Sequence, residues 1–362
     1  MRPNPIPDIF DQLKEIVHKY LYLEDERYEA VLAAWIIHTY FMDCMYTTPR
    51  LLIRSAIPGC GKTRALELLH ALCNNAIFTS DATGSPVMRT LAAARADGKY
   101  VTYLLDEAET YATTVARAGT YVENLLRSGY KKGGKFHRSA KVKESYMPEE
   151  LDIFGPVAIG MIGEMPSTIK QRSIDIEMFK NRNRQLANFE PTAFMESVHA
   201  LRIALAELKP EDLQKEINMA RIANLDLRNR EREIWEPLLS VAAVAGNIHI
   251  EEMIQLICFL EHNRELSEED YQQKILESVS NILPQIEDER IRSEDLLKLL
   301  LKEDIWLDYS DIGLNQNLLA LLLRPFKIRT KTMRTGPDTP RCYAKSDLQS
   351  AVDRYMHIPR NR

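Results

Sequence analysis

The stretch Arg50-Leu51-Leu52-Ile53-Arg54-Ser55-Ala56-Ile57-Pro58-Gly59-Cys60-Gly61-Lys62-Thr63 decides the fold. An apolar run closes on a glycine-rich turn, a lysine and a threonine, and a helical pattern follows over residues 64–69. A strand, such a turn and a helix together are the context of a phosphate-binding P-loop. The amides of the turn face one concavity, and the dipole of the helix adds positive potential, so a polyphosphate can bind there.

The side chains of this turn have separate expected roles. We expect Lys62 to contact the β- and γ-phosphates of ATP, and the hydroxyl of Thr63 to bind Mg²⁺. The GxxxxGK[ST] template asks for glycine where this chain has Ala56, although Gly59 and Gly61 keep the turn flexible. The expected nucleotide-binding residues are Pro58, Gly59, Cys60, Gly61, Lys62, Thr63 and Arg64.

The composition is that of a globular protein. The 362 residues are enough for two or three domains, and 45% hydrophobic and 27% charged residues are near globular averages. We expect a cytoplasmic protein with no membrane partner, because no apolar stretch of about 18 residues is free of charge and the N-terminus lacks a signal-peptide pattern. Five scattered cysteines without a CxxC pair are typical of reduced thiols. The net charge of −5 leaves a nucleic-acid partner open, because cations can be concentrated locally.

A second apolar run, residues 100–105, ends in Asp106 and Glu107. This is the Walker B pattern, in which the carboxyl end of a strand brings carboxylates next to the phosphates. We expect Asp106 to hold Mg²⁺, and Glu107 to orient and deprotonate the attacking water. The pair follows Lys62 by about 45 residues, with strands and helices alternating between them, and this spacing supports the interpretation.

A third strand pattern, residues 157–162, precedes Arg172. In ring-forming ATPases the strand after the Walker B pair ends in a polar sensor, and a later arginine contacts the γ-phosphate of a neighbouring subunit. Arg172 has the position of that arginine, so the expected catalytic residues are Lys62, Glu107 and Arg172. The other candidates are Glu164 or Ser167 for the sensor, and Arg182 or Arg184, more simply surface charges, for the arginine.

Residues 130–143 carry six cations and no acid around Gly133-Gly134. A hairpin that turns at these glycines could follow a phosphate backbone, and the alternative is a solvated loop. The DNA contacts expected here are Lys131, Lys132, Lys135 and Arg138.

The rest of the chain is mainly helical up to about residue 284, which suits a lid. Within the lid, Arg230 is the candidate for a second sensor that folds back on the nucleotide. Residues 290–362 have the helix and strand order of a winged helix, with Ser293 as a helix cap. From residue 324 onward ten Lys or Arg stand against three Asp, which is an electrostatic footprint for nucleic acid; protein docking is the alternative. The expected DNA contacts are Lys331 and Arg334.

We therefore expect an α/β P-loop NTPase core of the AAA+ type with a helical lid and a C-terminal winged-helix-like domain. The expected boundaries are 1–48 for an N-terminal helical segment, 49–190 for the core, 191–285 for the lid and 286–362 for the winged helix.

Several motifs occur along nearly the whole chain. They are Trp35-Ile36-Ile37-His38-Thr39, Thr48-Pro49-Arg50-Leu51, Pro58-Gly59-Cys60-Gly61-Lys62-Thr63-Arg64, Leu104-Leu105-Asp106-Glu107-Ala108-Glu109-Thr110, Phe154-Gly155-Pro156, Gln171-Arg172-Ser173-Ile174, Trp235-Glu236-Pro237-Leu238-Leu239 and Leu323-Arg324-Pro325-Phe326. Together they resemble a domain-of-unknown-function family of phage, plasmid and mobile-element ATPases, often fused to primase or toprim-type modules. The chain differs at Arg127, where the family tends to have Asn, and at Gln171, where it tends to have Asp.

The resemblance implies a helicase-like AAA+ ATPase, a homo-oligomeric ring and action on DNA. No primase module is present, so we expect a stand-alone enzyme that hydrolyses ATP with Mg²⁺ and moves or remodels single- or double-stranded DNA. Two other classes stay open: an ATP-switched DNA-binding regulator, and a protein-remodelling ATPase of a defence or mobile-element system.

Overall fold

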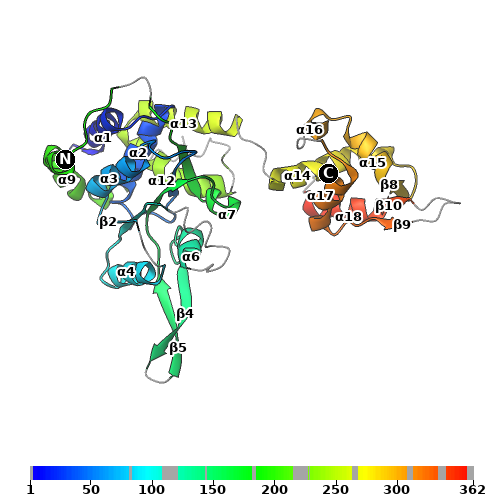
Figure 1. Ribbon diagram of the computed structural model, residues 1–362, viewed down its shortest axis with the longest axis horizontal. Coiled ribbons are helices and arrows are strands. Elements are labelled where there is room, and N and C mark those ends of the chain that lie inside the picture. The colour runs from blue at the N-terminus through cyan, green and yellow to red at the C-terminus, as the bar shows by residue number, and fades with distance from the viewer. Residues whose placement is uncertain are drawn as a thin grey trace. The chain divides into compact units, whose positions relative to one another are not determined.

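The computed structural model describes residues 3–80, 84–107, 121–142, 145–181, 185–214, 227, 229–262, 268–307, 313–332 and 340–356. They form two compact units, Met1–Glu261 and His262–Arg362, each with its own hydrophobic core (Figure 1). Within these ranges, no helix has the length and apolar character needed to cross a bilayer.

The first unit is built on five parallel strands in the order β2-β3-β6-β1-β7. Their bounds are Arg50–Ser55 for β1, Ala76–Thr79 for β2, Thr102–Leu105 for β3, Val157–Ile162 for β6 and Ser173–Glu177 for β7. The middle of β1, Leu51-Leu52-Ile53, is apolar and buried because neighbours pair with the strand on both sides. Parallel strands end at one edge, so the turn after β1 and the acids after β3 meet there. This is the predicted α/β P-loop fold of the AAA+ type, in which β6 lies between β1, which leads to the P-loop, and β3, which leads to the Walker B acids.

Helices α3 (Lys62–Leu72), α4 (Gly84–Ala96), α6 (Tyr121–Ser128) and α7 (Ser167–Lys170) connect the strands of this sheet. The helices of the predicted N-terminal segment, α1 (Ile6–Tyr20) and α2 (Arg27–His38), pack against α12 (Asn229–Ala245) of the predicted lid. Helix α2 is apolar all round and is buried over most of its length, as expected for a helix covered on every side. The segment 1–48 is therefore part of the first unit.

A two-stranded hairpin extends from the body of the first unit (Figure 1). Its strands are β4 (Lys135–Val142) and β5 (Ser145–Asp152), and Val142 pairs with Ser145. A hairpin is therefore present, but its two strands do not reverse at Gly133-Gly134 as predicted; the tight turn at these glycines precedes the hairpin, with the amide of Gly134 donating to the carbonyl of Lys131 at 2.9 Å. Gly133 has a φ of 83° and lies at the base of the hairpin, where a left-handed residue leads the chain from α6 into β4.

The predicted lid contains α8 (Pro191–Ser197), α9 (His199–Ala206), α10 (Pro210–Gln214), α12 and α13 (Asn247–His262). The structure divides the chain at residue 262, inside the predicted lid, so α14 (Glu268–Ile282) belongs to the second unit. The reason is packing: Ile275 and Val279 of α14 are buried with Leu296 and Tyr343 of the second unit. Helical periodicity alone does not say which core a helix joins.

The described residues of the second unit form five α-helices and three short strands. After α14 come β8 (Arg290–Arg292), α15 (Ser293–Leu300), α16 (Asp304–Leu307), α17 (Gln316–Leu323), β9 (Lys331–Thr332), β10 (Arg341–Ala344) and α18 (Lys345–Tyr355). The strands form an antiparallel sheet in the order β8-β10-β9. Asn315 caps α17 by accepting hydrogen bonds from two amides of its first turn. Ser293, predicted as a cap, is instead the first residue of α15, and its side chain makes no capping bond.

Candidate nucleotide-binding site

The turn after β1 has the backbone of a phosphate cradle. Gly59 and Gly61 have φ values of 80° and 96°, which L side chains rarely adopt, and α3 begins directly after Gly61. Ala56, by contrast, is not among the residues with positive φ. Alanine is tolerated at the template's first glycine position because the backbone there does not need the left-handed region.

Lys62 lies inside this cradle. Its side chain is buried, and its Nζ donates a hydrogen bond to Ser55 Oγ over 2.7 Å. Ser55 Oγ in turn donates to the carbonyl of Ile57 at 2.6 Å. Within the described part of the chain no carboxylate pairs with Lys62, so its charge is held by neutral groups at the place expected for a polyphosphate.

The Walker B acids reach the same place. Thr63 Oγ1 donates to Asp106 Oδ2 over 2.8 Å, although the two residues are 43 positions apart. Asp106 is buried, and Gly160 of β6 makes room for it: a Cβ at residue 160 would lie 2.8 Å from Asp106 Oδ1. A hydroxyl and a carboxylate side by side at the mouth of the cradle are the donors that Mg²⁺ prefers, so these two residues fit the ion.

Glu107 has an unusual backbone. Its φ is 53°, and its amide donates to the Oδ1 of Asp106 at 3.0 Å. A left-handed conformation costs a non-glycine residue about 1–3 kcal/mol and is found most often at functional sites. The side chain is exposed beside the cradle, as a residue that orients water requires.

The sensor candidates have other engagements or cannot be placed. Glu164 pairs with Arg54 at 2.9 Å and with Lys170, in an ion-pair group that also includes Asp175. Burial raises the pKa of Asp175 against the opposing effect of Arg54. Glu164 therefore secures the ends of β6, β1 and β7 to α7. The side chain of Ser167 and the residues Arg182 and Arg184 lie outside the described residues.

Arg172 lies at the opposite edge of the sheet from the P-loop. Its carbonyl accepts a hydrogen bond from the amide of Arg50, at the amino end of β1, and the next residue, Ser173, begins β7. From Arg50 to Ser55 a strand spans about 16 Å at roughly 3.3 Å per residue. Arg172 therefore faces away from the P-loop of its own chain.

Arg230 lies beside Arg172 and not near the P-loop. It stands in the first turn of α12, and its Nη1 donates to Gln171 Oε1 over 2.7 Å. The expectation that Arg230 folds back on the nucleotide of its own chain is therefore wrong. Charge type alone did not reveal this position, because the turn that carries Gln171 is some 60 residues away along the chain.

The basic residues at the hairpin are mostly engaged within the protein. Lys131 pairs with Glu233 at 2.7 Å, Lys132 donates to the carbonyl of Asp43 at 3.0 Å, and Lys135 pairs with Glu150 across the hairpin. Lys131 and Lys135 are thus paired with acids on α12 and β5. These acids lie outside residues 130–143, so a count of charges in that segment does not include them. The side chain of Arg138 is outside the described residues.

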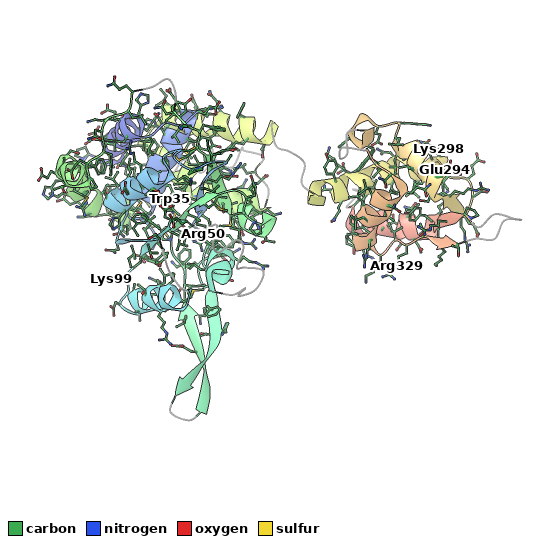
Figure 2. The ribbon with its side chains drawn as sticks, in the orientation of Figure 1. Trp35, Arg50, Lys99, Glu294, Lys298 and Arg329 are labelled. Carbon is green, nitrogen blue, oxygen red and sulfur yellow. The ribbon has the colours of Figure 1, made fainter. Side chains whose placement is uncertain are left out.

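The second unit keeps exposed cations. Arg324, Lys327, Arg329, Lys331 and Arg341 are exposed, and within the described ranges none of them has an ion-pair partner (Figure 2 labels Arg329). Arg334 lies outside the described residues. Lys298 of α15, also labelled, is different because it pairs with Glu294 at 2.8 Å.

Two site residues were missed from the sequence. Arg50 is fully buried, and its guanidinium donates to the carbonyls of Leu125 and Gly155 at 2.6 Å and of Leu126 at 3.3 Å. Burial lowers its pKa to about 9. The second missed residue is Gly160, which makes room for Asp106. The sequence signals for the two residues were an arginine at the start of a buried strand and a glycine inside one.

Comparisons with known proteins find only remote similarity to this chain. The family model described as a protein of unknown function (DUF3631) matches residues 179–355, just under half of the chain. This segment contains Arg230 and residues 262–355 of the second unit, but not the P-loop, Asp106 or Arg172. No curated protein matches the chain.

Among solved structures, 76 chains match this chain, and three of them are described here. The apo C-terminal region of NrS-1 is 12% identical, with a TM-score of 0.41 over 94% of this chain and 75% of that chain. The structure titled SCCmec type IV Cch, active helicase, is 11% identical, with a TM-score of 0.39 over 96% and 71%. The ORC2 protein of Aeropyrum pernix is 12% identical, with a TM-score of 0.31 over 96% of both chains. The assignment of the fold rests on the strand order and the P-loop of this chain.

Proposed function

We propose that this chain is a Mg²⁺-dependent ATPase that hydrolyses ATP between copies of itself and couples hydrolysis to the binding and remodelling of DNA. The observation that carries the proposal is the convergence of Lys62, Thr63 and Asp106 at one edge of the sheet, with Glu107 next to them. Two sequence segments meet there, residues 62–63 and residues 106–107, and each supplies a different part of a hydrolytic site.

The residues divide the chemistry between them. Lys62 would leave Ser55 and contact the β- and γ-phosphates, while the amides of the Gly59–Gly61 turn would bind phosphate oxygens. Thr63 and Asp106 would hold Mg²⁺, which, when bound, neutralises charge on the phosphate oxygens. Glu107 would orient a water and accept its proton as the water oxygen attacks the γ-phosphorus and the bond to the β–γ bridging oxygen breaks.

Arg172 completes this site from a neighbouring copy. It lies at the edge opposite its own P-loop, so a γ-phosphate that it contacts belongs to another chain. An arginine supplied in this way is worth about 10³- to 10⁵-fold in turnover. A head-to-tail ring is the assembly that gives every site such a neighbour.

The second unit is the proposed DNA contact. Five exposed cations that have no ion-pair partner among the described residues lie on β9, on β10 and in the segment 324–329 that follows α17. Such cations bind phosphates by releasing counterions, so affinity for single- or double-stranded DNA should fall steeply with salt. The ion-paired lysines at the base of the hairpin contribute less.

Glu107→Gln tests the hydrolytic role. The variant should bind ATP like the wild type, because the P-loop is untouched, but should hydrolyse it at least about 100-fold more slowly, since the base is lost. Glu24→Gln, at an exposed glutamate between α1 and α2, is the control. Wild-type turnover by Glu107→Gln would show that another group activates the water.

The DNA role has a separate test. ATP hydrolysis is measured with and without single- and double-stranded DNA, on protein whose oligomeric state is checked with ATP bound. Arg329→Ala with Lys331→Ala should weaken DNA binding and DNA-stimulated turnover at low salt, and should leave turnover without DNA unchanged. Lys298→Ala is the matched control because its ammonium is already paired. DNA stimulation also separates a motor from a nucleotide-switched regulator.

A further inference from the structure

Three arginines from separate elements gather at the amino edge of the central sheet. Arg172 precedes β7, Arg230 stands in the first turn of α12, and Arg127 lies in the last turn of α6. Gln171 joins the first two: its neighbour in the chain is Arg172, and its Oε1 accepts a hydrogen bond from Arg230 at 2.7 Å. The P-loop lies at the other end of β1.

Within the described part of the chain, neither Arg172 nor Arg230 has a carboxylate partner at ion-pair distance. Arg172 is half-buried over the ring of Tyr130, 5.4 Å from its centroid. Its Nη1 donates to the carbonyl of Thr168, and its buried Nε has no hydrogen-bond partner among the described residues. Burial lowers the pKa of the Arg172 guanidinium, and the charges of Arg230 and then Arg127 lower it further. A cation destabilised by burial and by like charges gains from an anion more than a solvated one does.

The carboxylate of Glu233 approaches this group, but it is already engaged. One oxygen accepts from Lys131 at 2.7 Å and the other from the hydroxyl of Tyr130 at 2.9 Å. Glu233 stands three residues after Arg230 on α12. Burial raises the pKa of Glu233, but the hydrogen bonds from Lys131 and Tyr130 and the charge of Arg230 lower it overall. The Nη1 of Arg172 and the Nη1 of Arg230 each donate within the chain, and Glu233 takes none of their other donors, which are therefore left to a ligand from outside.

The identity of Gln171 fits an anion site. Its neutral amide fixes the guanidinium of Arg230 and leaves the full positive charge in place. A carboxylate at residue 171 would form an ion pair with Arg230 and cancel the attraction for a second anion.

We propose that Arg172 and Arg230 form one phosphate-binding pair that contacts the γ-phosphate of ATP held by the neighbouring copy, with Gln171 as the positioning residue for Arg230. This inference rests on the proposed ATPase function. It moves Arg230 from its own nucleotide to that of the neighbour, and it makes α12 a second element that reaches across the interface. Two guanidiniums on separate elements can bind different oxygens of the γ-phosphate, whose charge spreads over three oxygens in the transition state.

The test compares Arg230→Ala, Arg172→Ala and Gln171→Glu in the full chain. All three should bind ATP at their own P-loop like the wild type, because that site lies at the other edge of the sheet. Arg230→Ala should lower turnover by about 100-fold, in the range found for the loss of one transition-state donor. Gln171→Glu keeps the size of the side chain and should lower turnover in the same direction, although every guanidinium is still present.

Mixing separates action on the neighbour from action on the chain's own nucleotide. Arg230→Ala has an intact Glu107, and Glu107→Gln has an intact Arg230, so a mixed ring contains sites with every group. In random equal mixing of a head-to-tail ring, about a quarter of the sites are complete. Hydrolysis should then rise to about that fraction of the wild-type rate, although each variant alone is nearly inactive.

Each other outcome identifies what has failed. Wild-type turnover by Arg230→Ala, with Arg172→Ala slow, overturns the pair and leaves the proposed function standing. A slow Arg230→Ala that mixing does not rescue assigns Arg230 to its own chain. Wild-type turnover by Arg172→Ala would show that Arg172 does not act on the γ-phosphate held by the neighbouring copy. If turnover without DNA is unchanged in Arg230→Ala but DNA binding is lost, the phosphate belongs to nucleic acid and the inference is wrong. Arg230→Lys, which keeps the charge, replaces Arg230→Ala should the latter not fold.

Discussion

His38 makes the first unit sensitive to acid. It lies at the end of α2 and is completely buried. Its Nδ1 donates to the carbonyl of Trp35, and its Nε2 accepts from Thr48 Oγ1 at 2.9 Å, because a carbonyl can only accept. Both nitrogens are thus satisfied by the neutral ring, and burial lowers the pKa of His38 from 6.5 to about 4.

The sign follows from which state binds the proton first. As the pH falls below 6.5, the unfolded chain takes up the proton while the folded chain does not, so the free energy of unfolding decreases until about pH 4. With one pH unit of displacement worth 1.36 kcal/mol, the whole effect is about 3 kcal/mol. Between pH 7 and pH 5 the same two pKa values lower the free energy of unfolding by about 2 kcal/mol.

The assay is urea unfolding at pH 7 and pH 5, in wild type and in His38→Gln. A Trp306→Phe background leaves Trp35 and Trp235 as reporters of the first unit, since Trp306 belongs to the core of the second. The variant lacks the titrating ring, so its loss between the two pH values should be smaller than that of the wild type by about 2 kcal/mol. An equal loss in both proteins would refute the role of His38, and the other titrating groups cancel in the comparison.

Three further substitutions test single contacts, two in the first unit and one in the second. Arg50→Met leaves buried carbonyls without their charged donor and should lower the free energy of unfolding of the first unit by about 3–5 kcal/mol; a urea midpoint like that of the wild type would contradict this. Gly160→Ala places a Cβ 2.8 Å from both Asp106 Oδ1 and Leu66 Cδ1, so the carboxylate must move and ATP turnover should fall by about 10- to 100-fold, with a higher Mg²⁺ requirement as the readout. Asn315→Ala removes the cap of α17 and should cost the second unit about 1 kcal/mol in thermal or urea unfolding, with ATP turnover without DNA unaffected.

Local pattern predicted the nucleotide edge of the sheet well. The expected strand at residues 157–162 has the bounds found in the structure, and the apolar run 100–105 contains β3. The proximity of Thr63 and Asp106 was predictable because parallel strands end at a common edge, whichever residues lie between them. Both inferences use only the period of the apolar residues and the chemistry of a short motif.

The opposite edge was less predictable because its contacts join distant parts of the chain. Lys131 meets Glu233 about 100 residues later, so a count of cations in one segment overstated its free charge. Arg230 meets Gln171 across about 60 residues, and the lid position assigned to it could not reveal that contact. The membership of α14 in the second unit likewise depends on which core its apolar face covers.

Strand β1 physically joins the two edges. At its carboxyl end it carries Ser55 and the P-loop, and at its amino end Arg50 donates its amide to the carbonyl of Arg172. The guanidinium of Arg50 holds the last carbonyls of α6, so the backbone beneath the interface arginines is secured to the strand that leads to the nucleotide. A strand paired on both sides cannot slide without breaking its register, which repeats every two residues, or about 6.6 Å. If ATP binds as proposed and displaces the P-loop, the displacement would therefore reach Arg172 as a movement of the whole sheet. On this argument, successive sites in a ring would be coupled through the rigidity of β1.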